Sequence, residues 1–211
     1  MISVFFPFIL SFLSITPSWT TTPSHEKQAQ TLVRQFSQGI EALGQHADKD
    51  QYKIFHRLLS QHFAFEEIAI FCLGPRWKSL SPHQRTMYKQ WLSHDVLRNY
   101  KSQMFNHDYA YQDKNLTVTK ITQPFENEWH VHCQLKRNQE VYTVIWVISK
   151  LDSEKTTASN TLRITTLLFD TLDFVDTKRQ EIEAAIQNAG GIAPWLRQCQ
   201  KSLVKFGEKT P

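Results

Sequence analysis

Residues 129–148, WHVHCQLKRNQEVYTVIWVI, contain the clearest strand pattern in the chain. In the first half, apolar side chains alternate with polar ones, which predicts a strand with one buried and one solvated face. The apolar positions are Trp129, Val131, Cys133 and Leu135. A short polar turn at 137–140 leads to residues 141–148, which are apolar or aromatic on both faces. Because the link is short, we expect an antiparallel pair.

Two further segments fit the same sheet. Residues 116–122 are rich in β-branched side chains, and residues 162–169 are apolar on both faces after a polar loop at 152–160. Short links favour antiparallel neighbours, so we expect one four-stranded antiparallel sheet with its central pair of strands covered on both sides.

Helical spacing dominates the region before the sheet. Apolar side chains recur every three or four residues in 29–43, in 54–63 and in 65–73. The last of these patterns ends at Gly74-Pro75, which is a strong helix stop. The sequence therefore predicts three helices in this region.

The best helix start in the chain is at Ser81. Proline follows at the first helical position, and Gln84 can reach back to the Ser81 amide, which completes a capping box. The predicted helix is long, and its apolar face is wide and rich in aromatic side chains.

A second group of helices follows the sheet. Asp173 is a suitable cap for a helix over 174–189, Gly190-Gly191 ends that helix, and residues 192–204 have the pattern of a last one. The order of helices, sheet and helices is typical of the α+β class. With 211 residues and neither an internal repeat nor a linker, we expect one domain over residues 23–211.

The N-terminus differs from the rest of the chain. Residues 1–19 have no charged side chain, and residues 4–15 are almost wholly apolar but too short and proline-interrupted for a membrane-spanning helix. A stretch of small residues follows. This is the layout of a signal peptide, which we place at 1–22, although the Lys or Arg usual near its start is missing. An uncleaved anchor is the alternative, and either feature predicts export from the cytoplasm.

Neither the net charge nor the cysteines indicate a nucleic-acid-binding protein or a CxxC site. The formal net charge is +4, with 24 basic and 20 acidic residues, which does not by itself predict a nucleic-acid-binding surface. The three cysteines, Cys72, Cys133 and Cys199, lie in apolar patterns and form no CxxC pair. We interpret them as buried apolar residues, with one disulfide as the alternative.

Catalytic motifs are hard to find. The sequence has no GxSxG element, phosphate-binding loop or dinucleotide glycine pattern. His130 and His132 share a strand face, but that face is the polar one and no further ligand is near in sequence, so we expect solvated histidines and no metal. Asp170 and Asp173 could form a carboxylate pair, but a helix cap explains Asp173 more simply. We therefore expect no enzyme and no cofactor.

Three stretches together carry a resemblance to a known family. They are an apolar-acidic helix that runs into Leu-Gly and a tryptophan at 63–77, the Ser-Pro-His-Gln-Arg helix start at 81–85 with its aromatic helix, and the segment 162–196, in which a strand, an acidic turn and a helix precede Gly-Gly-Ile and Trp-Leu. In this order the chain resembles the MlaC-type family over residues 30–205. Its members are also described as toluene-tolerance proteins or as auxiliary components of a lipid ABC transporter, and it has a hopanoid-associated branch.

The resemblance implies a periplasmic carrier. Members of the family bind phospholipid with the acyl chains inward and ferry it between outer- and inner-membrane complexes, without a cofactor or catalytic residues. We therefore expect a phospholipid ligand, transient contacts with membrane-bound transport complexes, no nucleic acid and a monomer. Three features depart from the family pattern. Leu162 stands where a tryptophan is usual, residues 170–173 lack the usual glycine and serine, and the loop at 152–160 is longer than usual.

A carrier of this kind implies that the helices and the sheet enclose an apolar pocket with a wide wall. The long helix and the two strands that are apolar on both faces could supply this wall. The expected lipid-binding residues are Phe71, Leu73, Trp77, Met87, Trp91, Tyr100, Met104, Tyr142, Val144, Trp146, Ile164, Leu168 and Phe174. For each of them, simple core packing is the alternative. Basic residues near the helix ends, which could meet a lipid head group, are Arg76, Lys78, Arg85 and Lys89.

Two other classes of function stay open at this stage. One is a periplasmic interaction protein with a filled core, which would have no extractable lipid. The other is a small enzyme of the NTF2-like shape, which would need polar side chains that converge inside the pocket.

Overall fold

The computed structural model describes residues 24–105, 116–137, 140–151 and 161–205, with the side chains at 48–49, 100–105 and 137 excluded. The expected signal peptide at 1–22 and the polar loop at 152–160 lie outside the described residues. Among the described residues, no helix is long and apolar enough to cross a membrane.

Three helices and a short 3-10 turn come first, as the periodicity predicts. They are α1 (His25–Leu43), α2 (Asp48–His62), α3 (Phe65–Leu73) and η1 (Gly74–Ser79). Helix α3 ends where Gly74 takes the left-handed conformation, with φ 58°, which favours glycine because it has no Cβ.

The long helix α4 (Pro82–Phe105) starts at the predicted capping box. The Ser81 backbone N–H donates to Gln84 Oε1 at 2.9 Å, and the Gln84 backbone N–H donates to Ser81 Oγ at 3.3 Å. Two N–H groups that the helix itself leaves unpaired are thus satisfied, which fixes where the helix begins.

The sheet is an antiparallel meander in the order β1-β2-β3-β4-β5. Its strands are β1 (Leu116–Phe125), β2 (Glu128–Arg137), β3 (Glu140–Lys150), β4 (Leu162–Phe169) and β5 (Leu172–Asp173). The prediction of four strands is wrong, because the sheet also contains the short strand β5. Asp170 takes a positive φ of 54° and turns the chain back, so that Leu172 pairs with Phe169 and Asp173 with Leu168.

Helices α5 (Phe174–Asn188) and α6 (Ile192–Lys205) complete the chain. Asp173 caps α5 as predicted: its Oδ1 accepts from the Val175 and Asp176 backbone N–H groups at 2.8 and 3.0 Å, and from Thr166 Oγ1 at 2.8 Å. Gly190 and Gly191, both with positive φ, separate the two helices.

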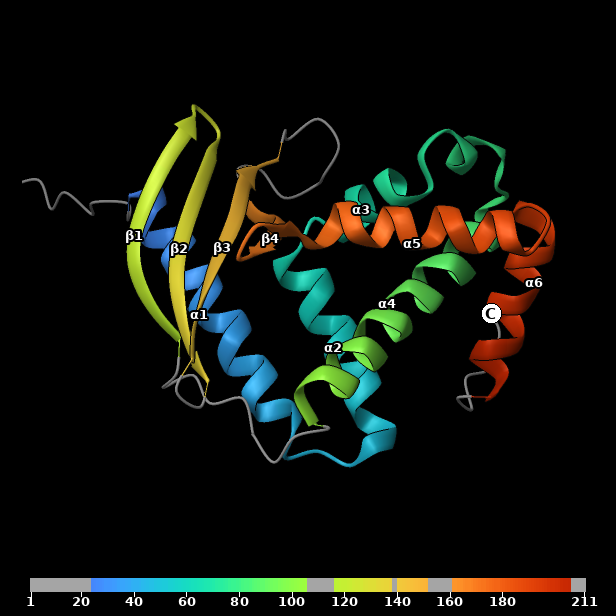
Figure 1. The fold of residues 1–211 in the computed structure, drawn as a ribbon, viewed down its shortest axis with the longest axis horizontal. Helices are drawn as coiled ribbons and strands as arrows, with labels where there is room; N and C mark the ends of the chain where they lie inside the picture. Colours follow the sequence, from blue (N-terminus) through green and yellow to red (C-terminus); the bar gives the residue numbers. More distant parts are fainter. Residues whose placement is uncertain (1–23, 106–115, 138–139, 152–160, 206–211) are drawn as a thin grey trace, which may run out of the picture.

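Helix α1 crosses one face of the sheet, and the other helices extend from the β4 side (Figure 1). We call the face toward α1 the inner face. Ring contacts join it to α1, since His25 meets Trp129 with centroids 5.0 Å apart and Phe36 meets Trp146 at 5.7 Å. On the opposite, outer face Val147 is buried but Val141 is 54% exposed, so the second apolar face of β3 is covered only in part.

Candidate functional site

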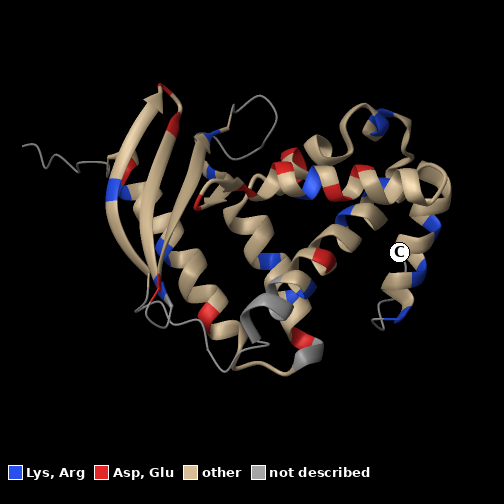
Figure 2. Ribbon diagram, in the orientation of Figure 1, with Lys and Arg blue, Asp and Glu red and all other residues tan. Residues whose placement is uncertain are grey.

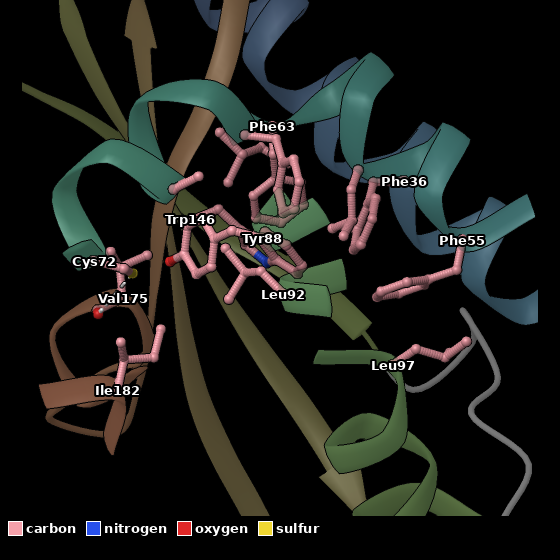
Figure 3. Packing of buried hydrophobic residues seen from close by; sticks show 14 of the residues in the cluster. Phe36, Phe55, Phe63, Cys72, Tyr88, Leu92, Leu97, Trp146, Val175 and Ile182 are labelled. Atoms are coloured by element: carbon pink, nitrogen blue, oxygen red, sulfur yellow. Dashed lines mark hydrogen bonds between the residues drawn. The ribbon is translucent and has the colours of Figure 1, made fainter. Parts of the chain in front are cut away.

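The inner face of the sheet is sealed at the end where β2 begins. Ile148 and Ile164, opposite each other on β3 and β4, are both 0% exposed. Phe36 packs edge-on against Phe63 at 4.9 Å as well as against Trp146 (Figure 3). Apolar side chains from α1, from the α2–α3 connection and from the sheet therefore close this end.

The same face is accessible at its other end. Phe169 is 38% exposed although it lies opposite Val144, which is 5% exposed. The Phe169 and Tyr142 rings lie 5.1 Å apart, and Leu116 on β1 is half-buried. Apolar side chains thus continue along this face from a buried end to a partly exposed end, where two aromatic rings lie side by side. We call the inner-face residues Leu116, Tyr142 and Phe169 the open end.

A β-bulge in β4 places one of the expected lipid-binding residues, Leu168, on the other face of the sheet from the one predicted. Strict alternation places Ile164 and Leu168 on one face, but the pairing shifts between Val147 and Ile148, which lie opposite Thr166 and Ile164. The extra residue reverses the parity of the strand beyond it. Leu168 therefore lies opposite Ile145 on the outer face.

Sequence reasoning missed two residues of the inner face for this reason. Leu167 lies opposite Trp146, and Phe169 lies opposite Val144. The signal in the sequence is weak, because residues 167–169 are all apolar and either parity looks acceptable. On β1 a similar shift after Val118 keeps Val118 and Ile121 on the inner face.

The expected residues on η1 and α4 lie together in the helical half of the molecule. Trp77 and Met87 are buried, and the Trp91 ring meets Trp195 of α6 with centroids 5.0 Å apart. Tyr88, 0% exposed, joins this cluster through Trp77 at 6.3 Å and Trp195 at 5.9 Å. This packing fits an aromatic core between helices, which was the alternative reading of these residues.

The remaining expected residues divide into three groups. Phe71 is not part of an interior wall, since it is 44% exposed on α3 with the Arg179 guanidinium 4.9 Å from its ring. Glu66 and Glu67 mark the exposed side of α3, and Phe71 lies on that side, four residues after Glu67. Leu73 is buried and Phe174 half-buried against the core. The Tyr100 and Met104 side chains lie outside the described residues.

Most of the basic residues near the helix ends already have protein partners. Arg76 makes two hydrogen bonds to Glu183, at 2.5 and 2.9 Å, and Lys89 pairs with Glu66. Arg85 lies over the Trp77 ring at 5.2 Å. Lys78 is exposed. These contacts leave little reason to assign a lipid head group to this cluster.

A hollow of about 540 Å³ lies along α5 beside the Arg76–Glu183 pair. Its lining is largely charged or polar and consists of Asp176, Arg179, Gln180, Glu183, Ala184 and Gln187. Acyl chains require an apolar lining, so this hollow is not suited to them.

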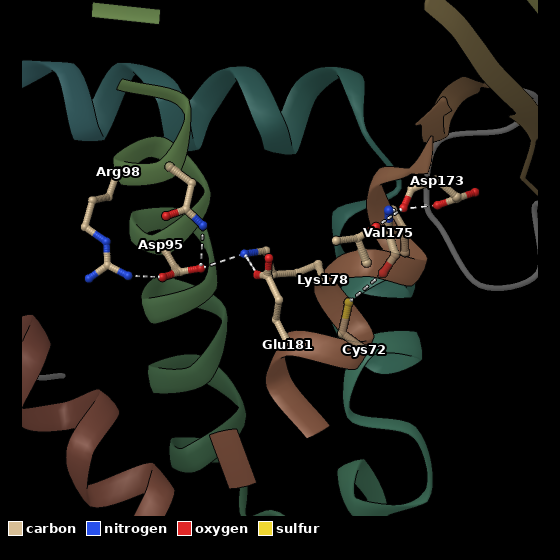
Figure 4. Close-up of polar contacts among 9 residues, drawn as sticks. Cys72, Asp95, Arg98, Asp173, Val175, Lys178 and Glu181 are labelled. Atoms are coloured by element: carbon tan, nitrogen blue, oxygen red, sulfur yellow. Dashed lines mark hydrogen bonds and ion pairs between the residues drawn. The ribbon is translucent and has the colours of Figure 1, made fainter. Parts of the chain in front are cut away.

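A buried ion cluster joins α4 to α5 (Figure 4). The Lys178 side chain is only 5% exposed, and its Nζ donates to Asp95 Oδ2 at 2.9 Å and also pairs with Glu181. Arg98 pairs with the other Asp95 oxygen. Burial by itself would lower the pKa of Lys178, but its hydrogen bonds to Glu181 and Asp95 raise that pKa above the usual value. Lys178 is therefore a charged group inside the helical half, held by two carboxylates.

The polar groups that could suggest catalysis have structural roles. Ser93 Oγ lies 3.1 Å from His56 Nδ1, but Ser93 is 0% exposed and its hydroxyl donates to the Gln90 carbonyl, so a substrate cannot reach it. Asp170 Oδ1 accepts from the Thr143 backbone N–H at 3.1 Å, and Asp173 is a helix cap. Neither arrangement presents an accessible nucleophile beside a base.

The two strand histidines each have a neighbour on β1 or β2. His130 Nε2 lies 2.8 Å from Glu128 Oε1, and His132 Nε2 lies 3.1 Å from Thr122 Oγ1. Within the part of the chain that the structure describes, no three His, Cys, Asp or Glu side chains gather as metal ligands would.

The three cysteines are free and buried, as their apolar surroundings predict. Burial raises the pKa of the Cys72 thiol to about 11 and that of Cys133 to about 12, and it also raises that of Cys199. These thiols stay protonated at neutral pH and are poor nucleophiles.

A histidine cluster between α2 and α4 makes folding sensitive to acid. The His94 ring stacks on Tyr52 with centroids 3.3 Å apart, next to His56. Burial, and to a lesser extent His56, lowers the pKa of His94 from 6.5 to about 4. Between these values the unfolded chain binds a proton that the folded chain does not. Stability is thus complete above pH 6.5 and falls as the pH falls toward 4.

We expect the free energy of unfolding to decrease over this range by up to about 1.4 kcal/mol per pH unit for one such group. The substitution His94→Gln should flatten this slope, and the exposed residue His46 provides the control His46→Gln. Urea unfolding followed by circular dichroism at several pH values measures the slope. Equal slopes for His94→Gln and the unaltered protein would contradict the assignment.

Comparisons with known proteins agree on the kind of fold. A family model described as MlaC protein matches residues 26–201. No curated protein matches the chain. A solved structure described as the phospholipid-binding protein from Ralstonia solanacearum in complex with a phospholipid superposes with a TM-score of 0.62 and 14% sequence identity, over 87% of this chain and 98% of that one. At this identity the likeness shows a shared fold.

Proposed function

The chain belongs to the MlaC family, and from this premise we propose that it is a phospholipid-binding carrier. It holds the acyl chains against the inner face of the sheet and leaves the head group in water. The observation that carries this proposal is the apolar inner face that is dry at Ile148 and Ile164 and reaches solvent at Phe169. The phospholipid named for the Ralstonia solanacearum structure supports the same class of ligand.

The physical need for a carrier follows from the cost of moving a lipid through water. Transfer of acyl chain into water costs about 0.8 kcal/mol per methylene, so a lipid with about 30 methylenes faces a cost of roughly 20 kcal/mol or more. A protein lowers this barrier only if it replaces the bilayer with apolar surface. The inner face offers such apolar side chains from the four neighbouring strands β1 to β4.

The proposed acyl surface differs in part from the sequence expectation. It keeps Tyr142, Val144, Trp146 and Ile164 and adds Leu167 and Phe169. Entry is at the open end, where Tyr142 and Phe169 are accessible. The helical residues Trp77, Met87 and Trp91 belong to the hydrophobic core between the helices and are not part of the proposed acyl surface.

We extend the proposal to the place of action and the partners, for which the family gives support. A signal peptide at 1–22 exports the chain to the periplasm, where residues 23–211 form one domain. The monomer takes lipid from one membrane complex of an ABC-type transport system and delivers it to another. The buried Ser93 and the capping role of Asp173 favour binding over catalysis.

The test is direct measurement of bound lipid. The mature chain, purified from a bacterial host, is expected to carry one phospholipid per chain by native mass spectrometry and to lose it on denaturation. Organic extraction and mass spectrometry then identify the lipid. A folded protein that is free of lipid would contradict the carrier and favour the interaction protein with a filled core.

A further inference from the structure

Helix α6 carries three cations on its outward face. Arg197, Lys201 and Lys205 follow each other at intervals of four residues, so they lie along one side of the helix, and all three are exposed. The opposite side is buried and consists of Trp195, Leu196, Cys199 and Leu203. Figure 2 shows these cations at the end of the molecule farthest from β1. We call Arg197, Lys201 and Lys205 the basic stripe.

Within the part of the chain that the structure describes, the basic stripe has no acidic partner. Helix α6 has no aspartate or glutamate, and none of the described residues outside it forms an ion pair with the three cations. Other cations of the helical half do have such partners, as Arg76 has Glu183 and Lys178 has Asp95. Three cations thus project from one helix without a counter-charge among residues 24–105, 116–137, 140–151 and 161–205, although the net charge of the whole chain is only +4.

We propose that the basic stripe docks on the surface of an anionic phospholipid bilayer. The basic stripe is about 12 Å long, at 1.5 Å per helical residue. It lies on the outward side of α6, so its three cations can contact a flat charged surface together. Val204 lies among the cations and is 59% exposed, so it can enter the head-group region. A protein interface is less well matched, because it needs aromatic anchors, and the described outward residues of α6 include none.

The inference goes beyond the proposed cargo, because it concerns how the protein approaches a membrane. The stripe lies on α6, at the opposite end of the molecule from β1 (Figure 1). Docking through α6 therefore leaves the open end of the inner face free, and the two proposals fail independently.

The experiment is flotation of the mature protein with vesicles of phosphatidylcholine that contain about one quarter phosphatidylglycerol. We expect binding at about 0.05 M salt, loss of binding at about 0.5 M salt, and little binding to phosphatidylcholine alone. The triple variant Arg197→Gln, Lys201→Gln, Lys205→Gln should bind about 100-fold more weakly, as expected for three basic side chains at an anionic surface.

A matched control variant has the same net charge as the triple variant but keeps the basic stripe. The variant Arg34→Gln, Lys53→Gln, Arg57→Gln removes three exposed cations from α1 and α2 and should bind within about threefold of the unaltered protein. Circular dichroism and native mass spectrometry should show an unchanged fold and lipid load for both. Equal weakening of the two variants, or equal binding to neutral vesicles, overturns the proposal. So does stripe-dependent binding to an acidic protein without binding to anionic vesicles.

Discussion

Aspartate at Phe169 is expected to lower the retained phospholipid by about tenfold or more. An ionised carboxylate on a surface that must meet acyl chains loses its hydration, at a cost of several kcal/mol, and about 1.4 kcal/mol already corresponds to tenfold in binding. Phe169 is 38% exposed, so Phe169→Asp should fold. The loaded fraction in native mass spectra and the phosphate content of the extracted lipid measure the effect.

The neighbouring strand offers a matched control. Val141 is 54% exposed and lies on the outer face, so Val141→Asp places the same charge on an exposed strand residue but away from the inner face. It should keep its lipid. If Phe169→Asp and Val141→Asp carry equal amounts, the acyl chains do not lie at the open end.

Loss of the Asp95 carboxylate is expected to destabilise the fold by about 3–5 kcal/mol, the usual cost of breaking a buried ion pair from one side. In Asp95→Ala the Lys178 ammonium stays in a site where its side chain is 5% exposed, and Glu181 is its one remaining carboxylate partner among the described residues. Urea unfolding at neutral pH should show a lower midpoint with an unchanged slope.

Removal of both charges separates this effect from simple loss of packing. The double variant Asp95→Ala, Lys178→Met should recover most of the lost stability, because it leaves no unpaired charge inside the protein. Asp176→Ala, at an exposed residue of α5, is the surface control and should change stability by less than about 0.5 kcal/mol. A double variant as unstable as Asp95→Ala would show that the cost does not come from the Lys178 charge.

Local chemistry accounts for the elements that could be predicted. Hydrogen bonds between residues two or three apart fix the starts of α4 and α5, at Ser81 and Asp173, so a single sequence window contains the whole signal. Likewise, the alternation over residues 129–135 requires no knowledge of the rest of the chain to predict a half-buried strand. The family resemblance extended the prediction from the fold to the ligand class.

Pairing between distant residues accounts for the errors. A bulge exists only relative to a partner strand, so the outward position of Leu168 depends on how β4 pairs with β3. The ion pair between Asp95 and Lys178 joins residues 83 positions apart, and the sequence around either residue does not predict it. Phe71 was misplaced because α3 has apolar side chains on its exposed side as well, where Phe71 lies on the same side as Glu67, so apolarity alone did not mark the buried face.

The sequence by itself determined the order and type of the six α-helices and four longer strands among the described residues, their main caps, the burial of the cysteines and membership of the α+β class. Each of these depends on side-chain periodicity or on bonds within one turn of chain. The tertiary structure alone decided which strand face meets α1, that this face is closed at Ile148 and open at Phe169, and that the cations of α6 have no counter-charge among the described residues. Those properties are relations between surfaces brought together by folding, and their free energies arise only when distant segments exclude water from each other.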